Sequence, residues 1–349
     1  MLTYLVKARD KALFIIDEPD IYLHSDLQRQ LLGLLRDLGP DILVATHSTE
    51  IVTEAEPDDI LVIDKKKKRA RRIGQPSGLA QVFSALGSNL NPVLTQLAKT
   101  RTAVFVEGKD FQILSKFARK LGHRDIANRS QFAVIPIEGF NPERARSLKA
   151  GMEATLGVPV QAALILDRDF RSRDECSAIS KECESFVEAV IIHPFKEVEN
   201  ALLVPAALDR AAERRVEERN RRASTALAYE PLAKATLESF ARATKNHVMS
   251  RWLSARYDFD RRQTPGINQA TSNERGLGEF EELWADAGGP LRLVQGKEAL
   301  REINKALQAA YGISVTPTGI VDAMAVADVP EGVTELIGKL VPFAKKHPQ

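Results

Sequence analysis

Short apolar runs alternate with amphipathic stretches along most of the chain. The first run, LFII at 13–16, is followed by a stretch with helical spacing over 25–38 and by a second run, ILVA, at 42–45. Beyond residue 101 the same alternation returns, with helical stretches between the apolar runs TAVFV, FAVIP, AALIL and EAVII. Apolar runs without polar alternation are typical of parallel strands that helices cover on both faces. The chain is therefore predicted to be an α/β protein with mostly parallel sheets.

Other patterns interrupt this alternation. DDILVIDKKKKRARRIG, at 58–74, predicts a hairpin with a strongly basic turn. After Val204, a long charged helical region reaches about residue 262 and leads into a loop rich in Gly, Asn and Thr, a strand at LRLV and a helix from Lys297 to about Tyr311. We expect these patterns to divide the chain into five parts. They are an α/β segment at 1–78, a connecting helical segment at 79–100, a larger α/β domain at 101–207, a helical insertion at 208–280, and the elements that complete the larger domain at 281–349.

Composition restricts the class of protein. No apolar run approaches the roughly 18 residues that a membrane-spanning helix needs, and Met1 is not followed by a basic-then-apolar leader. The two cysteines form neither a CxxC pair nor a cysteine–histidine cluster spaced for zinc. We therefore expect a cytoplasmic protein without a membrane partner. The net charge of +2 is too small to indicate a nucleic-acid partner, so only local basic patches could indicate one.

Two adjacent carboxylates end the first apolar run. Asp17 stands at the predicted strand tip, where a carboxylate can hold Mg2+ through water, and Glu18 stands where it can activate an attacking water. ATHS, at 45–48, places His47 at the tip of the neighbouring strand, within reach of a terminal phosphate. A buried strand that ends in a helix-capping Asp is the alternative, but it gives His47 no role.

The spacing and order of these residues resemble the second half of an ABC-type ATPase. Asp17 and Glu18 hold the Walker B positions, the D-loop falls at 20–26, and His47 holds the position of the switch histidine. The phosphate-binding loop G-x-x-x-x-G-K-S/T is absent, because none of the three Gly-Lys steps is followed by Ser or Thr. The signature segment that precedes Walker B is absent too. We therefore expect a fragment that starts inside an ATPase domain, binds ATP only with the missing first half, and does not hydrolyse ATP alone.

Further carboxylates end two strands of the second series. Glu107, in VEGKD, ends one predicted strand, and Asp167 and Asp169, in LILDRD, end another. The carboxyl ends of parallel strands meet at one edge of a sheet, so these three side chains are expected to converge. Converging carboxylates need a compensating cation, and hard oxygen ligands suit Mg2+ or Mn2+. E-G followed by D-x-D in this order resembles the Toprim domain of topoisomerases, primases and related nucleases.

The segment FKEVENALL, at 195–203, places Glu197 and Glu199 near the same sheet edge, where they would supply ligands for a second metal ion. For one of the two, a carboxylate favoured by a helix dipole at the helix start is the alternative. An ATPase half followed directly by a Toprim-like domain and this segment resembles the OLD (overcoming lysogenisation defect) family of nucleases over nearly the whole chain. The resemblance implies a Toprim-type, mostly parallel sheet flanked by helices, with a helical insertion, behind a partial ABC-type ATPase segment.

The resemblance also implies an activity and partners. A member of this family would nick or cut DNA at a Toprim site with two Mg2+ or Mn2+ ions, would couple to the ATPase as a homodimer in the full-length protein, and would have a helicase as a candidate partner. Glu107 would be a metal ligand and an acid or base, and Asp167 and Asp169 would bind the shared metals. Lys297, in VQGKE, would steady the transition-state phosphate, with a solvated helix start as the alternative.

Two parts of the pattern are less direct. Asp110 falls three residues after Glu107, whereas many family members carry an acid four residues after it, a position held here by Phe111. We include Asp110 among the expected metal ligands, with its position shifted by one residue from that of the family's acid. Glu138 and Gly139, in IPIEGF, stand at another predicted strand tip and are expected to border the site.

Two basic regions are candidates for contact with DNA. KKKKRARR, at 65–72, is a dense patch of the kind that releases counterions from phosphate, with a solvated hairpin as the alternative. The charged helical region is rich in arginine, and the expected DNA contacts are Arg214, Arg215, Arg221 and Arg222. Interleaved acids such as Glu217 and Glu218 make a charged scaffold helix the alternative.

Two other functional classes share parts of this pattern. A topoisomerase or primase would share the Toprim carboxylates, but a topoisomerase needs a tyrosine nucleophile in a DNA-gripping domain, and the five tyrosines fall in no such module. A DNA-binding ATPase subunit of the SMC/RecF type would carry the acidic centre as a vestige, although an unused cluster of carboxylates repels itself. His193 and Trp252 are expected to be structural.

Overall fold

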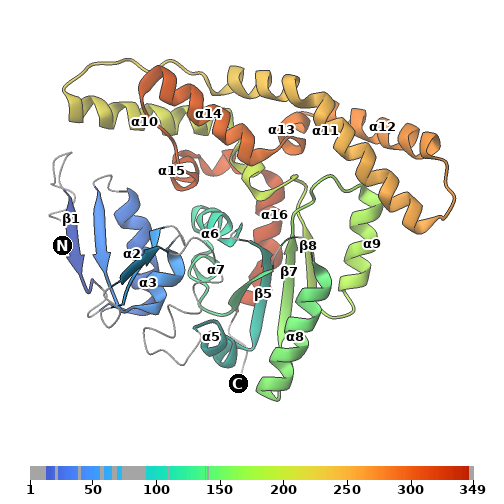
Figure 1. The fold of residues 1–349 in the computed structure, drawn as a ribbon, viewed down its shortest axis with the longest axis horizontal. Helices are drawn as coiled ribbons and strands as arrows, with labels where there is room; N and C mark the ends of the chain where they lie inside the picture. The colour runs from blue at the N-terminus through green and yellow to red at the C-terminus, as the bar shows by residue number, and fades with distance from the viewer. Residues whose placement is uncertain are drawn as a thin grey trace. The chain divides into compact units, whose positions relative to one another are not determined.

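A computed structural model describes residues 13–19, 23–37, 41–55, 59–64, 69–72, 92–108, 110–137, 139 and 141–345. It divides into two compact units, Met1–Lys99 and Thr100–Gln349. Figure 1 shows the helices and strands of both, coloured along the chain.

The first unit contains two parallel strands and two helices that pack against them. Strands β1 (Phe14–Asp17) and β2 (Ile42–Ala45) pair in parallel along their whole length. Helices α2 (Ser25–Asp37) and α3 (Thr49–Glu54) close an apolar core made by Ile16, Leu31, Leu35 and Ile51. The two strands and α2 lie where the apolar and amphipathic patterns predicted them, whereas α3 was not predicted.

The two strands are less buried than their apolar sequences predict. Ile15 and Leu43 lie opposite each other in the register and are 71% and 52% exposed. Side chains alternate between the faces of a sheet, so the helices that cover Ile16 leave this other face open among the residues described in the first unit. The prediction of buried strands is therefore wrong for one face of this sheet.

The basic segment forms the predicted antiparallel hairpin, with strands β3 (Leu61–Asp64) and β4 (Arg69–Arg72). Its turn, 65–68, lies outside the described residues, so only 69–72 of the candidate DNA-binding patch is described. Of the helical connection predicted over 79–100, the described part is α5 (Pro92–Thr100).

The second unit is built on a four-stranded parallel sheet. Its strands coincide with the four apolar runs of the second series and are β5 (Thr102–Glu107), β6 (Ala133–Ile137), β7 (Gln161–Leu166) and β8 (Ala189–Ile192). Their order in the sheet is β6-β5-β7-β8, and every neighbouring pair is parallel. Strands β5 and β7 are central, and five of the six residues of each are buried.

This strand order contains one reversal. The chain passes from β5 outward to β6, then crosses back over β5 to β7 and continues outward to β8. The connections leaving β5 and β7 therefore turn away from each other, which opens a crevice at the carboxyl ends of these two strands. In parallel α/β sheets, ligands bind at this point.

Helices cover both faces of the sheet (Figure 1). Helices α8 and α9 lie on one face, and α6 and α16 lie on the other, as right-handed crossovers require when the strand order reverses. Their bounds, with the short helix that follows α6, are α6 (Asp110–Lys120), α7 (Arg124–Ala127), α8 (Pro142–Leu156), α9 (Arg173–Cys183) and α16 (Glu331–Leu340).

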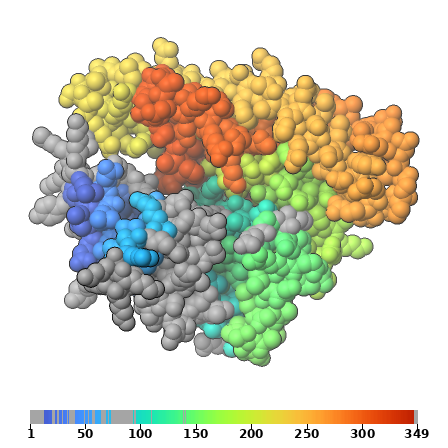
Figure 2. Space-filling view, viewed as in Figure 1, coloured from blue at the N-terminus to red at the C-terminus, as the bar shows by residue number. Residues whose placement is uncertain are grey.

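A helical part follows β8 and packs into the same apolar core as the sheet. In Figure 2 the side chains of α10 to α14 form one continuous layer above the green α8. The elements are η3 (Val198–Leu202), α10 (Pro205–Ala223), α11 (Ala233–Gln263), α12 (Gln269–Ala285), α13 (Gly289–Leu293), α14 (Gly296–Tyr311), α15 (Pro317–Ala323), η4 (Val326–Asp328) and η5 (Val341–Ala344). No helix in the described part of the chain has the length and apolar character to cross a bilayer.

Two elements in this part differ from the sequence predictions. Most of the predicted loop after residue 262 is helix α12, which Asn268 caps and which packs on α11 through Phe280 and Trp252. The predicted strand LRLV is instead the short helix α13, because Gly288 in a left-handed conformation and Pro290 in the first turn favour a helix start. Short apolar runs do not distinguish a strand from a buried helical turn.

Candidate active site at the edge of the parallel sheet

Two acids occupy the crevice between the central strands. Glu107 is the last residue of β5, and Asp167 follows the last residue of β7, so neighbouring strands carry them to the same edge. The pKa of Glu107 is raised to about 7, by burial first and then by the negative charges of Asp167 and Asp169, against the opposing effect of Arg171. The structure therefore brings together the three carboxylates that the strand ends predicted.

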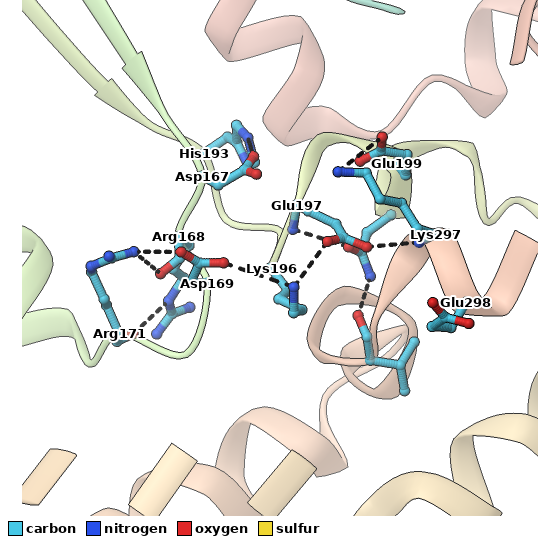
Figure 3. A network of polar contacts seen from close by, with 12 residues as sticks. Asp167, Arg168, Asp169, Arg171, His193, Lys196, Glu197, Glu199, Lys297 and Glu298 are labelled. Atoms are coloured by element: carbon cyan, nitrogen blue, oxygen red, sulfur yellow. Dashed lines mark hydrogen bonds and ion pairs between the residues drawn. The ribbon is translucent and has the colours of Figure 1, made fainter. Parts of the chain in front are cut away.

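Asp169 lies at the margin of this group. Its backbone adopts a left-handed conformation, with φ of 49°, and its N–H donates to Lys196 O at 2.8 Å. The carboxylate accepts a hydrogen bond from Arg171 Nη1 at 2.9 Å and lies 3.8 Å from Lys196 Nζ (Figure 3). Asp169 thus lies between two cationic side chains, Arg171 and Lys196.

Arg168, between the two aspartates, points away from them. Its guanidinium lies over the ring of Trp252, 5.2 Å from the ring centroid, and 3.9 Å from Glu279. The loop after β7 is thereby tied to helices α11 and α12. Trp252 is fully buried and is structural, as expected.

Asp110, in the first turn of α6, joins the acidic group. Its pKa is raised to about 9, by burial first and then by the charges of Asp167, Glu199 and Glu107, whereas Lys297 lowers it. Phe111 holds the position where many family members carry the acid, and it is buried against the ring of Phe132. The acid three residues after Glu107 therefore faces the site, and the residue four after it belongs to the core.

Glu197, which precedes η3, and Glu199, which lies within it, have different surroundings. Glu197 Oε1 accepts a hydrogen bond from the Lys297 backbone N–H at 2.7 Å, and its Oε2 accepts one from Lys196 Nζ at 2.9 Å. Glu197 therefore fits the alternative interpretation, a carboxylate at a helix start. The helix whose start it contacts is α14, which is distant in the sequence. The expectation that Glu197 is a metal ligand is not supported, because both of its oxygens bind protein donors.

Glu199 is the member of the pair that faces the other acids. Burial raises its pKa, Lys297 lowers it, and the charges of Glu197 and Asp167 raise it. Lys297 Nζ lies 3.6 Å from Glu199 Oε1 (Figure 3). Burial by itself would lower the pKa of Lys297, but the surrounding carboxylates, Glu199 first, raise it above its ordinary value. Lys297 is therefore a cation held beside the acidic group.

Asn200 sets the position of Lys297. Its side-chain Nδ2 donates to the carbonyls of Leu291 and Val294, at 2.7 and 2.8 Å, which anchors the turn before α14 on η3. Gly296 packs against the same residue so closely that a Cβ atom there would lie 2.7 Å from Asn200 N. The absence of a side chain at 296 allows this contact.

His193 is a neighbour of the site that the sequence analysis assigned only a structural role. It follows the last residue of β8 as Asp167 follows the last residue of β7, and the register pairs Leu166 with Ile192. Its Nε2 lies 2.8 Å from Asp167 Oδ1, and the residue is buried. Asp167 and His193 are each the first residue after one of two paired strands. This shared position was the signal in the sequence that could have identified their contact.

Two carboxylate oxygens of this group, Glu107 Oε2 and Glu199 Oε2, are buried without a hydrogen bond, and Asp167 Oδ1 is buried beside His193 Nε2. Buried carboxylates without donors are costly unless a cation or a proton compensates them. Among the described residues, no three such side chains stand close enough together to hold a metal ion as they are. The donor set fits a divalent cation that prefers oxygen, and binding one requires the side chains to close around it.

The other predicted site residues lie as follows. Gly139, in a left-handed turn with φ of 62°, lies just beyond the end of β6 at the same sheet edge, whereas Glu138 lies outside the described residues. On α10, Arg214, Arg221 and Arg222 are exposed, and Arg215 donates to Glu218 at 2.8 Å. Their contact with DNA stays a prediction.

The residues of the ATPase pattern also meet in the first unit. His47 Nε2 lies 3.2 Å from Glu18 Oε1, and the backbone N–H of His47 donates to Glu18 Oε2 at 3.3 Å. Glu18 has a left-handed backbone, with φ of 45°, directly after Asp17 at the end of β1. The parallel pairing of β1 and β2 brings together Glu18 and His47, the two residues for which the sequence analysis predicted Walker B and switch-histidine roles.

Comparison with known families agrees with this geometry. The family described as "AAA domain, putative AbiEii toxin, Type IV TA system" matches residues 1–53, which include Asp17, Glu18 and His47. The N-terminal part of the chain is therefore an ATPase-type region of the ABC/AAA class. No curated protein matches the chain.

Proposed function

We propose that the protein is a metal-dependent DNA endonuclease of the OLD type, coupled to an ABC-type ATPase in the full-length protein. The observation that carries the proposal is the group of five acids and one lysine at the reversal of strand order, which is defined by Glu107, Asp110, Asp167, Asp169, Glu199 and Lys297 and is called the acidic cluster below. The buried oxygens without hydrogen bonds support a site that a cation completes.

Each residue of the acidic cluster has a role in this proposal. Glu107, Asp110, Asp167 and Glu199 would hold the metal ions, and His193 would orient Asp167. When bound, Mg2+ or Mn2+ would supply the positive charge that stabilises a phosphodiester under attack. Glu107, with a pKa of about 7, can accept a proton from the attacking water at neutral pH. Lys297 would contact the phosphate oxygens, on which negative charge develops.

A nucleotide-hydrolysing subunit without nuclease activity is the second candidate. The match over residues 1–53 and the contact between Glu18 and His47 favour it. The matched family's description names a Type IV TA system, and the OLD resemblance implies phage defence, so we propose a role in defence for either candidate. A topoisomerase is less well supported, because the hydroxyl of Tyr229 donates to Asp209 at 2.6 Å and its ring packs on Tyr311.

Nicking of supercoiled plasmid tests the proposal. The chain would be incubated with Mg2+, Mn2+, Ca2+ or EDTA, beside Asp167→Asn and a matched control, Asp322→Asn, in which the altered residue is exposed on α15. We expect nicking that depends on Mg2+ or Mn2+, is lost in Asp167→Asn and is retained in Asp322→Asn. Nicking by Asp167→Asn at the rate of the unaltered chain would refute the site assignment. Absence of nicking with every metal by folded protein would favour the ATPase candidate.

A further inference from the structure

A cleft of about 890 Å3 lies beside the acidic cluster, between the loop after β7 and helix α11. Asp169 belongs to the cluster and also lines the cleft, so the two are continuous. Lys196, whose ammonium lies 3.8 Å from Asp169, lines it as well. The volume is in the range of pockets that enclose small ligands, about 300–1,000 Å3, and so suits a short length of one strand better than a duplex.

One face of α11 forms the opposite wall. The lining residues of this helix include His247, Arg251, Ala255, Asp258 and Arg262. They are spaced by four, four, three and four residues, which places them on one side of an α-helix. Ala255, in the middle, is the only small side chain of the five, and it leaves the space between the longer side chains open.

Cations outnumber acids on these walls. The lining contains five Lys or Arg residues and three Asp or Glu residues. Arg262 pairs with Glu175 at 2.9 Å, whereas Arg261 and Asp258 are 3.8 Å apart and both well exposed, so that pair contributes little. Arg251 is exposed and makes no ion pair with any other described residue of the chain. The cleft therefore presents positive charge that its own acids do not neutralise.

The aromatic side chain that lines the cleft has a cation over one face of its ring. Phe170 lines the cleft, but Lys196 Nζ lies over its ring, 5.3 Å from the ring centroid. Bases of single-stranded DNA bind by stacking on free aromatic faces, whereas phosphates bind to cations. The walls of this cleft therefore favour the sugar–phosphate backbone over the bases.

We propose that this cleft binds the backbone of a single DNA strand beside the bond that the acidic cluster cuts, with Arg251 in contact with a phosphate and Ala255 providing the space. The inference rests on the proposed function and adds the path of the substrate. Arg251 is then a positioning residue. The cleft is lined by α11 and not by α10, on which the sequence analysis placed the DNA contacts.

Binding of a fluorescein-labelled single-stranded DNA oligonucleotide to the full chain, measured by anisotropy in EDTA over a range of salt concentrations, tests this inference. The variants are Arg251→Ala, Ala255→Trp to fill the cleft, and Arg242→Ala as a matched control, because Arg242 is an exposed arginine of the same helix α11 that does not line the cleft. We expect Arg251→Ala to weaken binding several-fold and to lower the slope of log affinity against log salt by about 0.7, the value for one phosphate contact on a single strand. Ala255→Trp should weaken binding too, and Arg242→Ala should change neither quantity.

Three results would overturn the inference. They are an equal loss of affinity in Arg242→Ala and Arg251→Ala, undiminished binding in Ala255→Trp, and tighter binding of an RNA of the same sequence. EDTA prevents metal-dependent cleavage, so binding and nicking are measured separately. If plasmid is nicked but Arg251→Ala binds normally, the cleft assignment fails and the nuclease stands. If Arg251→Ala loses affinity but plasmid is never nicked, the DNA site stands and the nuclease fails.

Discussion

At the scale of single residues, Glu197 and Glu199 illustrate how two like side chains acquire different roles. They are two residues apart in the sequence. Glu197 accepts hydrogen bonds from the start of α14 and from Lys196, whereas Glu199 keeps a buried oxygen without a donor. A carboxylate that satisfies protein donors stabilises the fold, and one that lacks donors can serve a cation.

This difference predicts opposite phenotypes for the two amide variants. Glu199→Gln should abolish nicking and leave the unfolding midpoint in urea nearly unchanged or raised, because one buried charge is removed. Glu197→Gln should lower the free energy of unfolding by about 1.5–3 kcal/mol, the usual contribution of a hydrogen bond to a charged group. Urea denaturation followed by circular dichroism, together with the plasmid assay, measures both. A stable Glu197→Gln protein without activity, beside an active Glu199→Gln protein, would reverse the assignment.

The raised pKa values predict how stability depends on pH. The pKa of Glu107 is about 7 and that of Asp110 about 9 in the fold, both above their ordinary values, so the folded chain binds protons that the unfolded chain releases. Their contribution to stability is then fully present below about pH 4 and is lost as the pH rises through the folded values. In EDTA, we expect the melting temperature to fall from pH 5 to pH 8, with a smaller fall in Asp110→Asn.

Mg2+ supplies the control for this effect. At pH 8, where the acids are increasingly ionised in the fold, added Mg2+ should raise the melting temperature of the unaltered chain more than that of Asp110→Asn, because the ion compensates the same charges. Two results would contradict the raised pKa values of Glu107 and Asp110 in the fold. One is a melting temperature in EDTA that rises from pH 5 to pH 8, and the other is the same dependence on pH in the unaltered chain and in Asp110→Asn.

At the scale of elements, the site depends on how α14 docks on η3. The side chain of Asn200 donates hydrogen bonds to two carbonyls before α14, and the absence of a side chain at Gly296 lets the backbone of Asn200 approach closely. This contact brings Lys297 beside Glu199 although they are 98 residues apart. η3 and α14 are thus docked on each other by the contacts of Asn200 and Gly296, neither of which belongs to the acidic cluster.

Two glycine variants test this docking. Gly296→Ala places a Cβ atom 2.7 Å from Asn200 N, so we expect a loss of about 1–3 kcal/mol in the free energy of unfolding, together with reduced nicking as Lys297 shifts. Gly338→Ala is the matched control, because it lies inside α16 with no atom within 4 Å of the added Cβ, and it should stabilise by about 0.5–1 kcal/mol. Equal stability of the two variants in urea would show that the close contact is unimportant.

At the scale of the whole molecule, the chain carries two separate acidic sites. The contact of Glu18 with His47 lies in the first unit, whereas every member of the acidic cluster lies in the second. The acidic cluster draws its residues from β5, α6, the loop after β7, η3 and α14. All six residues of the acidic cluster therefore come from the second unit.

This separation predicts that Glu18→Gln nicks plasmid at the rate of the unaltered chain, with or without ATP. Asp167→Asn under the same conditions serves as the inactive reference. A lower rate in Glu18→Gln, with an unchanged circular dichroism spectrum, would mean that the ATPase-type region takes part in cleavage by this chain.

The sequence by itself determined the parallel strands and the residues at their ends. Continuous apolar runs identify strands that are covered on both faces, and the carboxyl ends of such strands share one edge, so Glu107, Asp167 and Asp169 could be placed together without coordinates. The placement of Glu18 and His47 at the tips of two neighbouring strands followed in the same way, and the structure adds the contact between them.

Only the tertiary structure decided which further residues join the site. Asp110 and Glu199 face the acidic cluster and Glu197 does not, and α13 is a helix where an apolar run predicted a strand. The cleft wall on α11 likewise depends on the direction in which that helix packs. The physical reason is that periodicity fixes which residues share a face of an element, whereas contacts between elements distant in sequence fix what that face meets.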